Sequence, residues 1–173
     1  MKEHRFIARR SKIIKQTSLI WLFVLIHIAL NFMITPKLIS NSQYTALLLI
    51  NLGLSMLSIP GVYLFFNYYR YSINKELILT YNTVRLIDHK TKEVIELLNN
   101  EIVTVTLNNH IRLSRLPWLF NEYFCLTDRN GKNIKITSWI MDISDLWTNT
   151  LSRKINNDNI VKNELVFPVV KTA

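Results

Sequence analysis

Two stretches decide the fold: TSLIWLFVLIHIALNFMI, from Thr17 to Ile34, and YTALLLINLGLSMLSIPGVYLFFNYY, from Tyr44 to Tyr69. Neither contains Asp, Glu, Lys or Arg. An α-helix rises 1.5 Å per residue, so about 20 apolar residues cross the roughly 30 Å hydrocarbon core of a bilayer. We therefore expect a transmembrane helical hairpin in residues 17–69, with spans at about 17–35 and 44–69.

A cleaved secretory signal is the alternative interpretation of the first stretch, because Arg9, Arg10 and Lys12 precede it. The stretch is longer than the apolar core of a signal, no small-residue cleavage site follows it, and a second stretch comes at once. Both spans are therefore expected to be retained. Five aromatic residues near the ends of the spans predict anchors at the membrane interface: Trp21, Tyr44, Tyr68, Tyr69 and Tyr71.

The charges predict the orientation of the hairpin. The net charge is +9, and the first fifteen residues hold six Lys/Arg against one Glu, whereas the connection 35–43 holds Lys37 alone. Basic residues favour the cytoplasmic side, and Arg70 and Lys75 follow the second span, so both termini are expected in the cytoplasm. Residues 1–16 are then a basic tail that binds the anionic membrane surface. The basic residues expected to do so are Arg5, Arg9, Arg10, Lys12 and Lys15.

The same charge argues against a nucleic-acid partner. A sequence pI of about 9.8 is typical of nucleic-acid binders, but only 19% of the residues are charged and the mean hydropathy is +0.15. Most of the excess lies beside an apolar stretch and not on a domain surface. We expect a lipid bilayer as one partner, a protein or peptide as another, and no nucleic acid.

Residues 72–173 follow a different pattern. Short β-branched runs are separated by clusters of Asn, Asp, Lys and Thr, which predicts a β-meander. The runs are 77–81, 83–87, 93–97 and 102–107. In the last of them Val103, Val105 and Leu107 alternate with Thr104 and Thr106, as in a strand with one buried face.

A β-hairpin is expected around Asp128-Arg-Asn-Gly131. A two-residue Asn-Gly loop would pair Leu126 with Lys135 and so mix apolar and polar side chains on one face. A three-residue loop ending in a left-handed Gly131 instead pairs Leu126 with Ile134 and Phe124 with Ile136. We favour the three-residue loop because it places four apolar side chains together.

After this hairpin the apolar period becomes helical. Asp142 or Ser144 can cap a helix over about 142–156, whose apolar stripe includes Trp147 and is expected to pack on the core. Residues 164–170 are expected to form a last strand, ended or placed at an edge by Pro168.

These features together resemble the bacterial pleckstrin-homology-like (PH-like) membrane proteins. The resemblance lies in the strands of 77–107, which end in IELLNNEIVTV, in YFCLTDRNGKNIKI at 123–136, and in the helix from Asp142; it covers about residues 73–156. It implies a membrane-anchored α+β fold, in which a two-helix anchor precedes a bent antiparallel sheet capped by a C-terminal helix. Relatives that bind phosphoinositides use clustered Lys/Arg between their first two strands. Here that turn, 81–83, has only Arg85 nearby, so the resemblance does not extend to phosphoinositide recognition.

The sequence offers few residues for catalysis. His4, His27, His89 and His110 are scattered without metal-ligand spacing, and Cys125 is the single cysteine. We expect no enzymatic activity, no metal and no cofactor. Asp88, Glu93, Glu96 and Glu101 are expected to be solvated surface groups.

Two groups of residues remain as candidate sites. His27 lies within the first span, where an ionisable side chain is a functional candidate, or a neutral helix contact hydrogen-bonded to Asn51 or Asn31. The stretch RLSRLPWLF at 112–120 mixes cationic and aromatic side chains, as interfaces do, or forms a loop that caps the sheet. Its candidate interface residues are Arg112, Arg115, Trp118 and Phe120.

Three functions are compatible with this layout. The first is a non-enzymatic, multi-pass protein of a bacterial cytoplasmic membrane that presents a PH-like interaction module to the cytoplasm. The second is an immunity protein against a membrane-active bacteriocin or peptide, and the third is an accessory subunit of a membrane complex. The many Ile, Lys and Asn residues fit an AT-rich bacterial genome.

Overall fold

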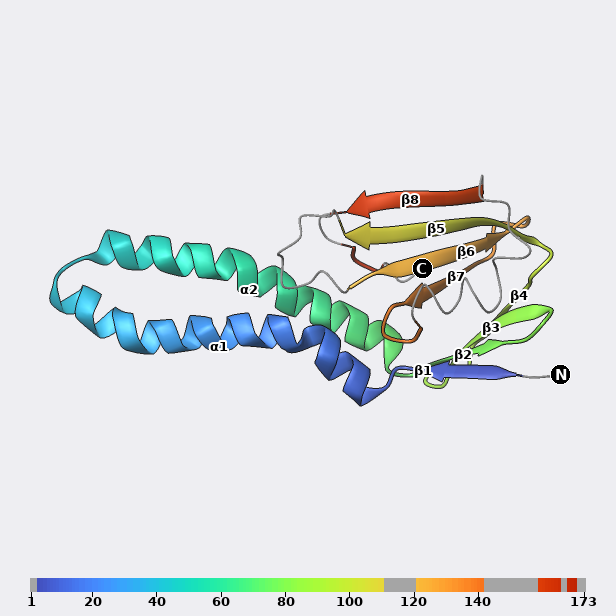
Figure 1. The fold of residues 1–173 in the computed structure, drawn as a ribbon, viewed down its shortest axis with the longest axis horizontal. Helices are drawn as coiled ribbons and strands as arrows, with labels where there is room; N and C mark the ends of the chain where they lie inside the picture. Colours follow the sequence, from blue (N-terminus) through green and yellow to red (C-terminus); the bar gives the residue numbers. More distant parts are fainter. Residues whose placement is uncertain (1–2, 111–120, 142–158, 166–167, 171–173) are drawn as a thin grey trace.

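A computed structural model describes residues 3–110, 121–141, 159–165 and 168–170. A long helical hairpin projects from a β-rich body (Figure 1). Its helices are α1 (Arg10–Ser40) and α2 (Tyr44–Ser72), which pack against each other in antiparallel fashion and are joined by residues 41–43. At 1.5 Å per residue each helix is about 45 Å long, so the predicted helices are confirmed and extend beyond the expected spans.

The first sheet takes strands from both sides of the hairpin. Its order is β1 (His4–Ile7), β2 (Lys75–Leu79), β3 (Thr83–Asp88) and β4 (Val94–Leu98), and all neighbours are antiparallel. Only Ile73 and Asn74 separate α2 from β2, so the helix continues into the sheet almost without a linker.

The second sheet is mixed. Its order is β7 (Asn133–Thr137), β6 (Tyr123–Asp128), β5 (Ile102–His110) and β8 (Ile160–Leu165). The β5–β6 and β6–β7 pairs are antiparallel, whereas β8 runs parallel to β5. The expectation of a wholly antiparallel sheet was therefore wrong, since a strand that returns from a distant segment is free to pair in either direction.

Alternating side chains of both sheets form one core. Leu77, Leu79, Val84, Leu86 and Leu97 come from the first sheet. They pack with inward residues of the second sheet, which include Val105, Phe124, Leu126, Ile134 and Ile136. The Lys132 ammonium also donates to the Glu96 carbonyl oxygen at 3.0 Å, which links β4 to the end of β7. Because the two faces share this core, the sheets form a single body.

The predicted β6–β7 register is confirmed. Phe124 lies opposite Ile136 and Leu126 opposite Ile134. The loop is Arg129-Asn130-Gly131, in which Gly131 has φ +79° and the Asp128 carboxylate accepts hydrogen bonds from the amides of Asn130 and Lys132. A glycine is favoured here because a Cβ is strained at this φ.

Three other expectations had different outcomes. Residues 1–16, expected to be a basic tail, form β1 and the start of α1 in their described part; an edge strand with one apolar inward residue gives little sequence signal. The last strand is Ile160–Leu165 and not 164–170. The expected helix at 142–156 lies outside the described residues.

Candidate functional site

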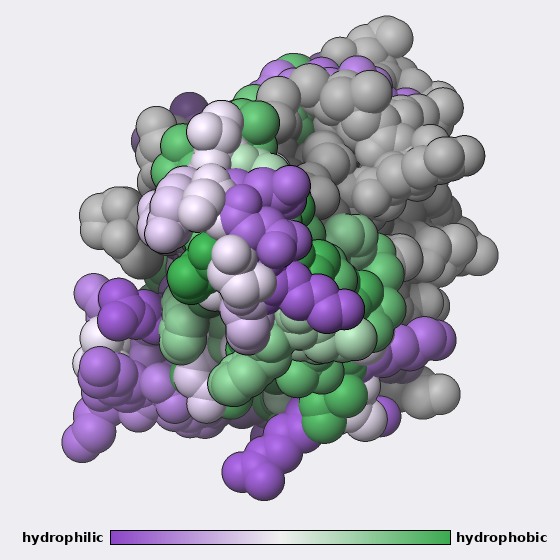
Figure 2. Space-filling model, turned by 90° about the vertical axis from the view of Figure 1, so that its left-hand side faces the viewer, coloured by the Kyte–Doolittle hydropathy of each residue, from purple (hydrophilic) through white to green (hydrophobic). Residues whose placement is uncertain are grey.

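The hairpin exposes an apolar surface. Both helices are long and apolar enough to cross a membrane, and of the most apolar stretch of each helix only 11% and 18% is buried. A core helix of a soluble protein is mostly buried, whereas these helices leave large side chains bare, including Leu25, Phe32, Met33, Leu49 and Ile59. Seen from the free end of the hairpin, apolar side chains surround the polar loop (Figure 2). Contiguous apolar surface of this extent marks an interaction or membrane surface.

Strand pairing fixes the two ends of the hairpin together. β1 precedes α1, β2 follows α2, and Phe6 of β1 lies opposite Leu77 of β2. The chain therefore leaves the sheet, turns at residues 41–43 and comes back to the same sheet. β1 and the β-rich body therefore lie at the same end of the hairpin, opposite to its free turn.

The five basic residues expected at a membrane surface divide into two groups. Arg9 precedes α1, and Arg10, Lys12 and Lys15 lie in its first turns. The first turn of α1 contains no acidic residue. These cations oppose the helix dipole, which favours negative charge at this end. Arg9, Arg10 and Lys15 are exposed. The structure therefore brings four of the five to the base of the hairpin.

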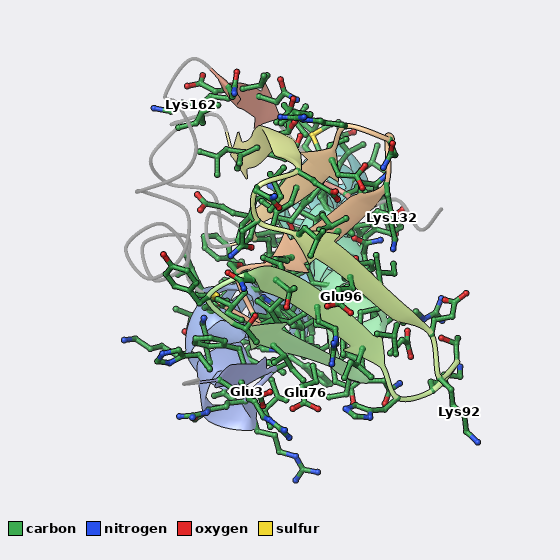
Figure 3. All side chains as sticks on the ribbon, turned by 90° about the vertical axis from the view of Figure 1, so that its right-hand side faces the viewer. Glu3, Glu76, Lys92, Glu96, Lys132 and Lys162 are labelled. Atoms are coloured by element: carbon green, nitrogen blue, oxygen red, sulfur yellow. The ribbon has the colours of Figure 1, made fainter. Side chains whose placement is uncertain are left out.

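Arg5 lies apart, on β1. Its guanidinium is 3.2 Å from the Glu3 carboxylate and 3.8 Å from that of Glu76, which also contacts His89 Nε2 at 3.0 Å. Glu3 and Glu76 occur together at the end of the body that faces away from the hairpin (Figure 3). Arg5 thus pairs with two carboxylates, Glu3 just before β1 and Glu76 of β2.

A polar cluster joins the two helices inside the apolar hairpin. His27 Nε2 lies 3.4 Å from Asn51 Oδ1, and His27 Nδ1 lies 3.3 Å from Ser58 Oγ. Asn31 Nδ2 donates to the His27 carbonyl oxygen at 2.9 Å. Of the two partners expected for His27, Asn51 lies against its ring, whereas Asn31 bonds to its backbone.

The neighbouring bonds assign the His27 proton. Asn51 Nδ2 donates to the Leu47 carbonyl oxygen, so Asn51 Oδ1 is an acceptor for an Nε2–H. On the other side of the ring, Nδ1 lies 3.3 Å from Ser58 Oγ, whose hydroxyl donates to the Leu54 carbonyl oxygen at 2.9 Å. The cluster satisfies polar groups in an apolar region and fixes the pairing of the helices.

Aromatic residues connect the base of α2 to the sheets. Tyr68 and Trp139 are fully buried, their ring centroids are 5.7 Å apart, and Trp139 Nε1 donates to Asn121 Oδ1. Tyr68 donates through its hydroxyl to the Pro168 carbonyl oxygen at 2.9 Å. Trp139 had no periodic signal in the sequence, although the apolar run that follows β7 contains it.

Tyr71 makes a second link. Its hydroxyl donates to the Lys135 carbonyl oxygen at 2.9 Å, and the Lys75 ammonium lies 3.5 Å from the centre of its ring. Burial lowers the pKa of Lys75, and the carboxylates of Asp88 and Glu93 oppose that shift. The expectation that Tyr68 and Tyr71 anchor the chain at a membrane interface was wrong, because both side chains are buried against protein. Trp21, Tyr44 and Tyr69 are exposed.

Two of the acidic residues expected to be solvated surface groups have partners within the protein. Arg85 donates to the Glu96 carboxylate at 2.9 Å, so the cation nearest the 81–83 turn is paired. The Asp88 carboxylate accepts hydrogen bonds from the amides of Lys90 and Thr91. No group of three metal-ligating side chains occurs among the described residues. The candidate interface of Arg112, Arg115, Trp118 and Phe120 lies outside the described residues.

A family model described as a PH domain matches residues 4–149. The chain belongs to the PH domain family. The match includes β1 and both helices, so the hairpin lies within the region shared with the family. A PH domain is typically a non-catalytic module that mediates protein or lipid interactions. No curated protein matched this PH domain chain.

Proposed function

We propose that this PH domain protein is a multi-pass protein of a bacterial cytoplasmic membrane that presents a non-enzymatic interaction module to the cytoplasm. The observation that carries the proposal is the exposed apolar hairpin whose two ends are held by one sheet. Leaving this surface in water would cost roughly 25 cal/mol per Å² of apolar area, so a lipid environment is the stable one.

Burial along the helices supports a division between lipid and protein. In α1 the buried residues are Ile13, Thr17 and Ile20, all near the base. Leu64, Tyr68 and Tyr71 of α2 are buried at the same end, whereas most large apolar side chains farther along the hairpin are exposed. About 30 Å of each helix, from about Thr17 of α1 onward, thus lies in the hydrocarbon core of a bilayer, with the cationic first turns of α1 at the headgroups.

The charge supports the direction of insertion. Arg9, Arg10, Lys12 and Lys15 lie at the base, beside the PH domain, and Lys37 is the single cation near the free end. Basic residues stay on the cytoplasmic side, so the PH domain and both termini lie in the cytoplasm.

Cysteine labelling of intact cells tests this topology. In a Cys125→Ser background, Ser42→Cys at the turn of the hairpin is expected to react with a membrane-impermeant maleimide. Lys90→Cys, on the turn after β3, reacts only after the cells are opened. Alkaline carbonate should leave the full chain in the membrane pellet. Release by carbonate, or labelling of Lys90→Cys in intact cells, would contradict the proposal.

The ligand of the module is a protein, a peptide or a lipid headgroup. Bacteriocin immunity and an accessory role in a membrane complex remain predictions from the sequence. Expression in a sensitive strain separates immunity from the other roles, since an unchanged inhibitory concentration across membrane-active peptides would exclude it for the peptides tested.

A further inference from the structure

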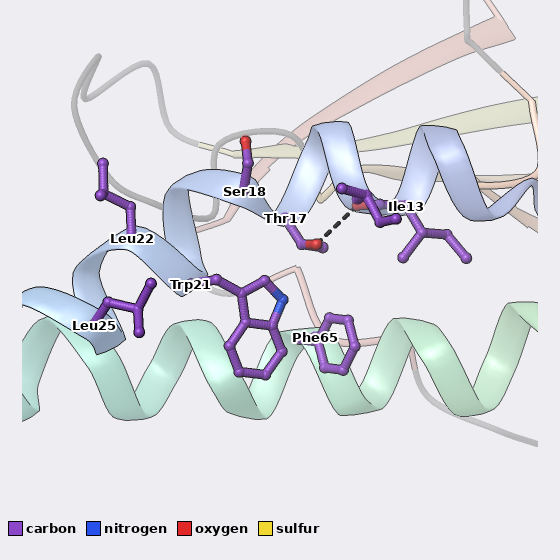
Figure 4. Close-up of a pocket in the computed structure, with 8 residues that line it drawn as sticks. Ile13, Thr17, Ser18, Trp21, Leu22, Leu25 and Phe65 are labelled. Carbon is purple, nitrogen blue, oxygen red and sulfur yellow. Dashed lines mark hydrogen bonds between the residues drawn. The ribbon is translucent and has the colours of Figure 1, made fainter. Parts of the chain in front are cut away.

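A groove runs along α1 at the base of the hairpin. Its volume is about 430 Å³, and nearly all of its lining is apolar. Ile14, Ser18, Leu22 and Leu25 follow one another along α1, and Trp21 and Phe65 form its wall (Figure 4). The Trp21 and Phe65 rings meet edge to face with centroids 5.1 Å apart, so the wall is a packed aromatic pair.

The length of the groove matches one leaflet of a bilayer. Ile14 and Leu25 are eleven residues apart, which is about 16 Å along a helix. Half of a roughly 30 Å hydrocarbon core is about 15 Å. An acyl chain that lies along this groove would therefore follow α1 from the headgroup region to the middle of the bilayer.

The polar end of the groove is cationic. Arg10 lies four residues before Ile14, and Lys15 lies three residues before Ser18, so both share the face of α1 that carries the groove. Both are exposed, and the first turn of α1 contains no acidic residue to oppose an anion. A phosphate here would also reduce the unfavourable interaction of these cations with the helix dipole.

We infer that the groove holds one anionic phospholipid, with an acyl chain along Ile14, Ser18 and Leu25 and its phosphate beside Arg10 and Lys15. The inference rests on the proposed membrane anchoring. It assigns a lipid site on the hairpin, outside the two sheets. Charge complementarity and length favour a lipid over a second copy of the chain, since another helix in this groove would bring the same cations together.

Native mass spectrometry of the full-length chain in a mild detergent tests the site, with phosphatidylglycerol or phosphatidylcholine of the same acyl chains added. A single phosphatidylglycerol adduct is expected, favoured over phosphatidylcholine by roughly 25-fold, because each of the two cations beside the anionic headgroup contributes roughly fivefold. Ser18→Phe fills the groove and should remove both adducts. Thr45→Phe, on the exposed start of α2, is the control for added bulk and should keep them.

Lys15→Gln should reduce the phosphatidylglycerol adduct by roughly fivefold and leave phosphatidylcholine unchanged. Lys37→Gln removes the same charge at the other end of the hairpin and should change neither. Equal occupancy by the two lipids, detergent alone in the groove, or a dimer that Ser18→Phe dissociates would each overturn the inference.

The lipid test and the anchoring test fail separately. A chain that resists carbonate but takes up no phosphatidylglycerol overturns the lipid site alone. A chain that carbonate releases, yet that binds phosphatidylglycerol in a Ser18-dependent way in detergent, overturns the anchoring and supports the groove.

Discussion

Phe6 lies opposite Leu77 in adjacent antiparallel strands, although the entire helical hairpin separates them in the sequence. Phe6 also packs against the main core, to which Leu77 belongs. The strand before the hairpin is therefore a structural part of the PH domain that follows it. This pairing holds both ends of the hairpin in one sheet, so the fold itself places them on the same side of the hairpin.

Replacing Phe6 should loosen the first sheet. Phe6→Ser removes a half-buried aromatic side chain, and we expect a loss of about 2 kcal/mol in the free energy of unfolding. Ile7→Ser changes the next residue, whose side chain is exposed, and should alter stability by less than about 0.5 kcal/mol. Denaturant unfolding of the full chain in detergent measures both. Equal losses would show that β1 does not contribute to the core.

The β6–β7 loop depends on one backbone conformation. Gly131 has φ +79°, and a Cβ at this position would meet no atom within 4 Å. Gly131→Ala should therefore cost about 1 kcal/mol from the backbone alone, and Gly131→Asn less, because Asn tolerates this region. Gly53→Ala is the matched control, since Gly53 also has free space but lies in α2, where Ala favours the helix. A midpoint temperature of thermal unfolding that is higher for Gly131→Ala than for the unchanged protein would contradict this account.

Features that depend on nearby residues could be predicted from the sequence. The Leu126–Ile134 register followed from alternation and loop length, because a slip by one residue exposes the apolar face. For the His27 ring, the scarcity of polar partners in an apolar hairpin left Asn51 or Asn31, and the structure places Asn51 against the ring. For the hairpin loop, the nearby sequence contained both the competing alternatives and a physical reason to choose between them.

Long-range pairing was not predictable in the same way. β1 has one inward residue among basic neighbours, and its partner β2 lies beyond the hairpin. The parallel pairing of β8 with β5 likewise depends on distant segments. Tyr68 was misassigned because lipid and protein interior are both apolar, so hydropathy does not separate a membrane anchor from a packed side chain.

The polar cluster of the hairpin should couple His27 to Asn51. In a double-mutant cycle with His27→Leu and Asn51→Leu, we expect a coupling energy of about 0.6 kcal/mol, typical of hydrogen bonds between transmembrane helices. A cycle of His27→Leu with Asn31→Leu is the control, since Asn31 donates to the backbone of His27 and not to its ring. Unfolding in detergent measures both cycles. Additive effects in the first cycle would mean that the ring contact contributes nothing.

The link between Tyr71 and Lys135 should weaken at alkaline pH. Burial raises the pKa of the Tyr71 hydroxyl above the usual 10.0, so the folded chain holds this proton more tightly than the unfolded chain does. The stability it contributes is then fully present below pH 10 and is lost as the pH rises above 10. Burial raises the pKa of the half-buried Tyr123 too, with the same sign. Burial lowers the pKa of Lys75, so the unfolded chain holds this proton more tightly than the folded chain does. The contribution of Lys75 therefore has the opposite sign, and it increases stability as the pH rises toward 10.5.

Tyr71→Phe separates these contributions. At pH 8 the free energy of unfolding of this variant should be about 1 kcal/mol lower than that of the unchanged protein, because the Lys135 carbonyl oxygen loses its hydrogen bond. Above pH 10 the variant should lose stability less steeply than the unchanged protein, so the two curves converge. Tyr123→Phe, which removes the less buried hydroxyl, should flatten the curve by a smaller amount. Urea unfolding at intervals from pH 8 to pH 11 gives the comparison, and curves for Tyr71→Phe that stay parallel to the unchanged protein would rule out Tyr71 as a source of the alkaline loss.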